Sequence, residues 1–146
     1  MTAPKRAGIE GEMVAEWSLV RQRWTITGRQ VEVHGHLLDL TATHPLTGEE
    51  WLVEVKVWRP GTGVDTIKKA IADAYDLAEA GEERPYLLML SKPMTGLYAQ
   101  MITRARRAGV INDVQLIGAT PHEPDDSWPV RRQEDDTPYH WIGDGS

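Results

Sequence analysis

The apolar and polar positions of the chain follow two periods, one typical of helices and one typical of strands. Apolar residues at steps of three and four predict three helices, and β-branched or alternating runs predict five strands. In chain order, we expect a helix over 9–23, strands over 25–33, 37–43 and 51–58, a helix over 64–80, a strand over 85–91, a helix over 95–108 and a strand over 113–117. This order, αβββαβαβ, predicts an α/β domain with a mixed sheet and a helix on each side.

Each predicted helix carries an apolar stripe along one face, and the stripes of the second and third helices are expected to be buried. The stripes are Met13, Trp17, Val20 and Trp24 in the first helix, Val64, Ile67, Ile71, Ala74 and Ala78 in the second, and Leu97, Met101, Ala105 and Ala108 in the third. Gly81 is expected to end the second helix. Short gaps predict that the first three strands form an antiparallel meander, and the continuous apolar run Tyr86–Leu90 predicts a central strand that is buried on both faces.

Composition and charge limit the classes of function. The 146 residues include no Cys, which excludes disulfides, thiolate metal sites and Cys nucleophiles and favours an intracellular, cytoplasmic protein. No apolar run approaches the ~18 residues of a membrane span, so no membrane partner is expected. The net charge of −6 is uneven, because residues 119–146 hold seven acidic and two basic residues. We expect one domain over 1–118, near neutral and able to present a basic face, and an acidic C-terminal tail over 119–146.

The tail has few apolar anchors, among them Trp128 and Trp141. We expect one or both of these side chains to dock on the domain or on a second protomer, because a freely solvated segment has little use for tryptophan. The alternative is a solvated tail without a role.

Charged residues interrupt two of the predicted apolar strands. Glu54 and Lys56 are two residues apart, so both side chains leave the same face of their strand. Asp39 interrupts the preceding strand in the same way. Burial of such groups costs several kcal/mol unless they pair or bind a ligand. Since paired strands lie ~4.8 Å apart, Asp39 and Glu54 are expected to share a hard cation such as Mg²⁺. Lys56 would orient or deprotonate a water, or steady a charged phosphate.

Glu12 is a further candidate, because it lies three and seven residues before Ala15 and Leu19 and so borders the apolar side of the first helix. Such a side chain can reach over a sheet to a metal or its water, and Glu10 and Glu16 are weaker candidates for that role. A structural interpretation stands beside this one: a buried ion pair and a solvated acid near a helix N-terminus. Three charged residues on adjacent strands favour a site.

These residues and their order resemble the PD-(D/E)xK, or restriction-endonuclease-like, nuclease superfamily. Asp39 is followed, after fourteen residues, by Glu54-Val55-Lys56. The segment 8–15, Gly-Ile-Glu-Gly-Glu-Met-Val-Ala, is similar to the G-x-x-x-E-x-x-A start of small stand-alone members, including YraN-like proteins and archaeal Holliday junction resolvases. The resemblance covers residues 8–91. It implies an αβββαβ core and hydrolysis of DNA phosphodiesters with Mg²⁺ or Mn²⁺.

The resemblance also implies a role for each residue. Asp39, Glu54 and the carbonyl of Val55 would hold the metal, Lys56 would activate or orient water, and Glu12 would assist through a second metal or a water. The chain departs from the family pattern in having Leu38 where the motif name has Pro, and in lacking a Gly-Ser-Gly segment before Asp39. Its second helix has Lys68, Lys69 and Asp73 where several members carry a Gln. The candidates for contacts to DNA are Lys68, Lys69, Arg21 and Arg29.

The expected function is therefore a metal-dependent DNA nuclease, an endonuclease rather than an exonuclease. Two alternatives stay open: a Holliday-junction-type or repair resolvase that recognises DNA structure, and a non-catalytic nuclease-fold module that binds DNA, a protein or a nucleotide. A domain of this size has little surface for reading a sequence, so a homodimer or a larger partner would supply specificity.

Overall fold

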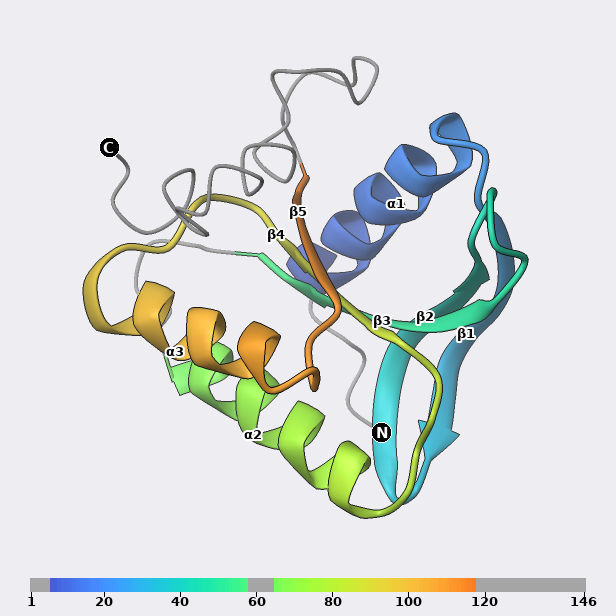
Figure 1. Ribbon diagram of the computed structural model, residues 1–146. Coiled ribbons are helices and arrows are strands. Elements are labelled where there is room, and N and C mark those ends of the chain that lie inside the picture. Colours follow the sequence, from blue (N-terminus) through green and yellow to red (C-terminus); the bar gives the residue numbers. More distant parts are fainter. Residues whose placement is uncertain (1–5, 58–64, 118–146) are drawn as a thin grey trace.

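The structure, a computed structural model, describes residues 6–57 and 65–117, with no account of the side chains of residues 6–10 and 65 (Figure 1). Its elements are α1 (Arg6–Arg21), β1 (Thr25–Val33), β2 (His36–Thr43), β3 (Glu50–Lys56), α2 (Asp65–Glu79), β4 (Tyr86–Leu90), α3 (Gly96–Arg107) and β5 (Asp113–Leu116). The predicted elements and their order are confirmed, with bounds that differ by a few residues. Trp58, Val64 and the predicted tail over 119–146 lie outside the described residues.

The five strands form one mixed sheet in the order β1-β2-β3-β4-β5. β1, β2 and β3 are antiparallel neighbours, which confirms the predicted meander, whereas β4 and β5 run parallel to β3 and β4. The sheet therefore changes from antiparallel to parallel at β3. All five residues of β4 are buried, as the apolar run predicts. Figure 1 shows α1 on one face of the sheet and α2 with α3 on the other.

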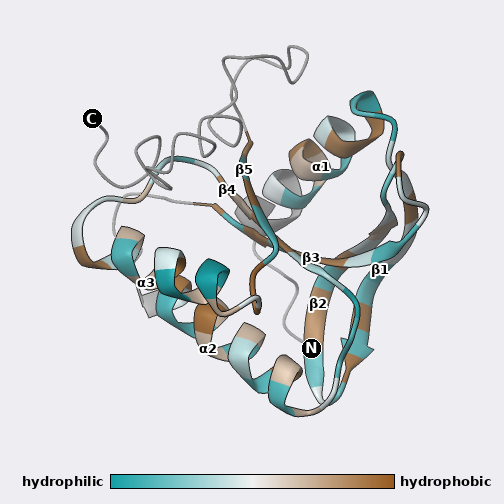
Figure 2. Ribbon diagram, in the orientation of Figure 1, coloured by the Kyte–Doolittle hydropathy of each residue, from teal (hydrophilic) through white to brown (hydrophobic). Residues whose placement is uncertain are grey.

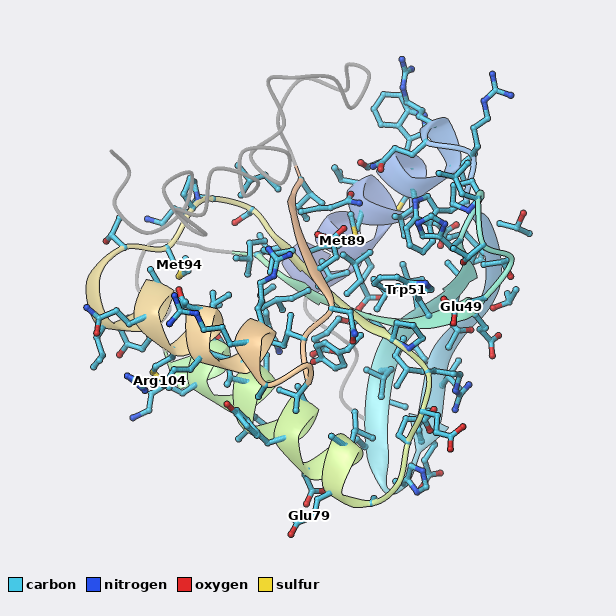
Figure 3. The ribbon with its side chains drawn as sticks, viewed as in Figure 1. Glu49, Trp51, Glu79, Met89, Met94 and Arg104 are labelled. Carbon is cyan, nitrogen blue, oxygen red and sulfur yellow. The ribbon has the colours of Figure 1, made fainter. Side chains whose placement is uncertain are left out.

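Each face of the sheet has its own hydrophobic core. Met89 belongs to the core under α1, and Met94 belongs to the core under α2 and α3. Figure 3 shows Met89 between the sheet and α1, and Met94 beside the start of α3. Because side chains alternate along a strand, Val53 and Val55 of β3 pack under α1. Leu52 points to the other face, and Glu54 and Lys56 follow it.

The apolar stripe of the first helix does not face the sheet. Met13, Trp17 and Val20 are exposed by 64, 50 and 52%, whereas Ala15 and Leu19 are fully buried. Both faces of the helix carry apolar residues, so periodicity alone could not choose between them. Gly11 and Ala15 are small, so the face that they share with Leu19 can lie close to the sheet.

Gly11 accounts for that close approach. It is a buried residue of α1, and a Cβ placed on it would overlap Cγ2 of Val57, just after β3. Trp24, the last residue of the predicted stripe, is buried but lies beyond the end of α1. Its ring packs edge-on against Trp51 of β3, with centroids 5.5 Å apart.

We expect the substitution Gly11→Ala to lower the free energy of unfolding by about 1–3 kcal/mol, because the added methyl group overpacks the contact with Val57. Ala favours the helix by about 1 kcal/mol relative to Gly, but we expect the cost of the steric overlap to exceed this gain. The matched variant is the double substitution Gly11→Ala with Val57→Ala, which removes the overlapping methyl group and should recover most of the loss in urea unfolding. Wild-type stability of Gly11→Ala would contradict this account of helix placement.

The stripes of the other two helices are confirmed only in part. Ile67, Ile71 and Ala74 of α2 are buried as predicted, but Ala78 is exposed. The buried residues of α3 are Ala99, Ile102 and Ala105, whereas the predicted Leu97 is 60% exposed and Ala108 is exposed. Ile102 therefore fills the core in place of Leu97.

Figure 2 shows the alternation of apolar and polar positions along α2. Gly81 follows the end of this helix, as predicted, with a positive φ of 95° that favours glycine. No helix in the described part of the chain combines the length and the hydropathy that a membrane span requires.

Candidate active site

The candidate site lies where β2 separates from β3. The two strands pair from Thr43 and Glu50 as far as Leu40 and Val53, and the ladder ends there. The next residue of β2 toward its start is Asp39. Its Oδ2 accepts a hydrogen bond of 2.7 Å from the backbone N–H of Val55. The carboxylate of Asp39 therefore fills the fork between the two strands.

The hydrogen bonding of β3 explains why the backbone N–H and carbonyl of Val55 face β2 and not β4. The Leu52 N–H donates to Pro85 O at 2.8 Å, and the Lys56 carbonyl accepts from Ser91 N at 3.1 Å, so these residues bond on the β4 side. Polar backbone groups of successive strand residues alternate between the two neighbours. Val55 is offset by one residue, so its N–H and its carbonyl both face β2. This orientation agrees with the predicted role of the Val55 carbonyl as a ligand.

Glu54 and Lys56 form an ion pair, with Lys56 Nζ 3.0 Å from Oε2 of Glu54. Both side chains leave the same face of β3, as the alternation predicts. Glu54 is buried, with 9% of its surface exposed, while the side chain of Lys56 keeps 23%. The second oxygen of Glu54, Oε1, is buried and has no hydrogen-bond partner among the described residues. A buried carboxylate oxygen without a partner is costly and calls for a ligand.

Glu12 reaches the same fork from α1. Both of its carboxylate oxygens accept hydrogen bonds from Nε2 of Gln30, at 3.0 and 3.2 Å. The carboxyl group of Asp39 lies close enough to contribute to the raised pKa of Glu12. The fold thus brings together all four residues that the sequence predicts for the site: Glu12, Asp39, Glu54 and Lys56.

The electrostatics of the fork favour a bound cation. Burial and the charge of Asp39 raise the pKa of Glu54 to about 7, although Lys56 opposes the rise. Burial and the neighbouring Asp39 likewise raise the pKa of Glu12 to about 7. Three ionised carboxylates and one ammonium group would carry a net charge of −2 in a partly buried site. A divalent cation would neutralise this charge, and protons do so at lower pH.

The residues fit a hard divalent cation in their chemistry. Mg²⁺ prefers oxygen ligands, takes one or two carboxylates and keeps several waters. Asp39, Glu54 and the carbonyl of Val55 can supply such a set, and the unpartnered Oε1 of Glu54 is one available ligand atom. Within residues 6–57 and 65–117, no group of three or more His, Asp or Glu side chains is already arranged around a metal position. The fit is therefore to a site of two carboxylates, with Glu12 beside it.

Gln30 is the residue of the site that sequence reasoning missed. It lies in β1 between two residues that pair with β2, and it has a positive φ of 51°. This left-handed conformation is uncommon for a residue with a side chain. It accompanies the hydrogen bonds to Glu12 described above. A polar residue in a strand carries no sequence signal for such a contact, which depends on the packing of α1 over the hairpin.

The four candidates for DNA contacts do not form one surface. Arg29 makes two hydrogen bonds to Glu16 of α1, at 2.8 and 2.7 Å, and Arg21 lies over the ring of Trp17. Lys68 and Lys69 lie on α2, on the other face of the sheet, where Lys69 pairs with Asp73 at 3.1 Å. Their role in DNA binding stays a prediction.

Comparison with known proteins adds one likeness of fold. No protein-family model and no curated protein sequence matches this chain. Among solved structures, the chain is similar to the crystal structure of a FdxN element excision controlling factor protein from Anabaena variabilis. The two superpose with a TM-score of 0.46 and 17% sequence identity, over 73% of this chain and 86% of that chain.

The raised pKa of Glu54 predicts how stability depends on pH in the absence of metal. The folded protein binds the Glu54 proton more tightly than the unfolded chain, so ionisation destabilises the fold as pH rises from about 4.5 to about 7. Glu54→Gln removes this cost. We expect the variant in EDTA to match the wild type near pH 5 and to exceed it by about 1–3 kcal/mol at pH 8 in urea unfolding.

The control for this experiment is Glu79→Gln. Glu79 is an exposed acid at the end of α2, and Figure 3 shows it pointing away from the fold. Its substitution should shift stability equally at both pH values. A pH-independent effect of Glu54→Gln would contradict the proposed burial of an ionised Glu54.

Proposed function

We propose that this protein is a divalent-metal-dependent DNA endonuclease that hydrolyses phosphodiester bonds with water. The observation that carries the proposal is the convergence of Glu12, Asp39, Glu54 and Lys56 at one fork of the sheet, with a net charge of −2 when all are ionised. DNA is the proposed substrate because the spacing of these residues and the order of the elements resemble the PD-(D/E)xK superfamily. The basic side chain of Lys56, partly exposed, is suited to an anionic phosphate.

Each residue of the fork has a distinct task in this proposal. Asp39, Glu54 and the Val55 carbonyl would hold Mg²⁺ or Mn²⁺. The bound ion supplies a Lewis acid for a phosphate oxygen and lowers the pKa of a coordinated water. Lys56 is held by Glu54 at 3.0 Å and would orient the attacking water or steady the phosphate. Glu12 has a pKa of about 7, so at neutral pH it can hold or release a proton at the other side of the fork.

The decisive experiment incubates the purified protein with supercoiled plasmid in Mg²⁺, Mn²⁺ or EDTA. We expect nicked and linear products with either metal and none in EDTA, and Asp39→Asn protein serves as the control for contaminating nuclease. Parallel reactions contain linear duplex, single-stranded DNA and a four-way junction. Shortening from ends alone would indicate an exonuclease, and cutting of the junction alone would indicate a resolvase. Binding of DNA without cleavage of any substrate would overturn the proposal in favour of a binding module.

A further inference from the structure

The outer face of α1 carries a continuous apolar stripe. Met13, Trp17 and Val20 are separated by four and three residues, so they lie along one side of the helix. They are exposed by 64, 50 and 52%. We name these three residues the α1 stripe. A row of exposed large side chains of this kind usually marks a surface that another segment covers.

The α1 stripe differs from the other exposed apolar residues of the described chain. The remaining large ones away from α1 are single residues on separate elements: Leu37, Leu46, Tyr75 and Leu97. Single exposed apolar residues are normal on protein surfaces and need no partner. Only α1 presents three of them in line within the part of the chain that the structure describes.

Positive charge lies at the C-terminal end of the stripe. The guanidinium of Arg21 is 5.1 Å from the centre of the Trp17 ring, and Arg23 is exposed just beyond the helix. Among the described side chains of α1, the two acidic ones have partners, since Glu16 binds Arg29 and Glu12 binds Gln30. The surface therefore suits an apolar segment that also carries acidic residues.

The chain leaves the described region beside this helix. Gln22, just after α1, donates a hydrogen bond of 2.9 Å to the side chain of Gln115 in β5. Ile117 packs in the core under α1 together with Ala15 and Leu19. Residues 118–146 follow directly, and they include an acidic, aromatic stretch in which Asp125 and Asp126 precede Trp128.

We propose that the segment 124–130 of this chain covers the α1 stripe and runs antiparallel to α1, with Trp128 on Val20 and Val130 on Trp17. Asp125 and Asp126 would then lie near Arg21 and Arg23. The eleven residues from 117 to 128 can span up to about 36–40 Å, which exceeds the ~24 Å length of a sixteen-residue helix. The segment supplies the apolar and acidic groups that the stripe suits, in one short stretch.

The chain contains no Cys, so a disulfide between two introduced Cys residues can be followed without competing thiols. The variant Val20→Cys with Ser127→Cys should form a disulfide within one chain under mild oxidation. Its matched control is Leu97→Cys with Ser127→Cys, because Leu97 is 60% exposed on α3, across the sheet from α1. We expect the first pair to close at least about tenfold faster than the control pair, since docking raises the effective concentration. Gel mobility and peptide mapping would separate bonds within a chain from bonds between chains.

A second measurement uses the trypsin sites at Arg131 and Arg132, next to the proposed segment. Trp17→Ser should speed cleavage there severalfold in the full chain, whereas the control Leu97→Ser should not. Equal closure rates for the two Cys pairs, together with unchanged cleavage in Trp17→Ser, would overturn the proposal. Disulfides between chains would overturn it as well, because they would assign the stripe to a second copy. Neither readout depends on DNA cleavage.

Discussion

Replacement of Lys56 by Met should abolish DNA cleavage while leaving the fold intact. The ammonium group is the only cation of the fork among the described residues that pairs with Glu54, at 3.0 Å. Its loss removes the group that we propose to orient water or steady the phosphate, and such groups are worth about 10²–10⁴ in rate. Met keeps the apolar length of the side chain, so the contacts along its stem persist. The measurement is the initial rate of plasmid nicking at saturating Mg²⁺.

Two further variants sharpen this prediction. Arg104→Met removes an exposed positive charge on the far side of α3, where Figure 3 shows it pointing outward, and should cleave at the wild-type rate. Lys56→Arg keeps a positive charge beside Glu54 but cannot lose a proton at ordinary pH. An inactive Arg variant would indicate proton transfer by Lys56, and a partly active one would indicate charge stabilisation. Wild-type cleavage by Lys56→Met would remove Lys56 from the site.

The strands of this fold could be predicted from the sequence more completely than the helix faces. The alternation in β3 was enough to place Glu54 and Lys56 on one face, because a strand side chain has only two directions. A helix has a continuous range of directions, and α1 carries apolar residues on both sides. Which side faces the sheet depends on the close approach at Gly11, a tertiary contact with Val57 that no local pattern contains.

Some residues of the candidate site could be predicted from the sequence and others could not. Charged residues inside apolar strands are a strong signal, since their burial needs a reason, and this signal found Asp39 and Glu54. The end of the β2–β3 ladder at Leu40 and Val53 gave no signal, although it creates the fork that Asp39 fills. Gln30 also gave none, because its contact with Glu12 joins β1 to α1 and depends on how the two elements pack.

Replacement of Asp39 by Asn should separate the part its carboxylate plays in the fold from the part we propose for it in metal binding. The amide oxygen of Asn can still accept the hydrogen bond from Val55 N–H, so the fork should keep its shape. The negative charge that raises the pKa of both Glu12 and Glu54 is lost. In EDTA at pH 8, the variant should therefore be at least as stable as the wild type.

Mg²⁺ should stabilise the wild type more than the Asp39→Asn variant, although the variant is at least as stable in EDTA. At a Mg²⁺ concentration of about 100 times the dissociation constant, the wild type should gain about 2.7 kcal/mol of stability. Loss of a ligand should weaken binding at least about a hundredfold, which reduces this gain to about 0.4 kcal/mol or less. Glu79→Gln, an exposed acid-to-amide change, should respond to metal as the wild type does.

Urea unfolding with and without Mg²⁺ measures both effects in the same samples. A variant of a metal ligand should keep its free energy of unfolding in EDTA and lose the increase that Mg²⁺ gives the wild type. A variant of a residue that only holds the fold would instead have a lower free energy of unfolding both in EDTA and in Mg²⁺. If Asp39→Asn gains as much stability from Mg²⁺ as the wild type, the metal does not bind at the fork. Cleavage, if present, would then need other ligands, and the roles proposed for Glu54 and Val55 would fall with that of Asp39.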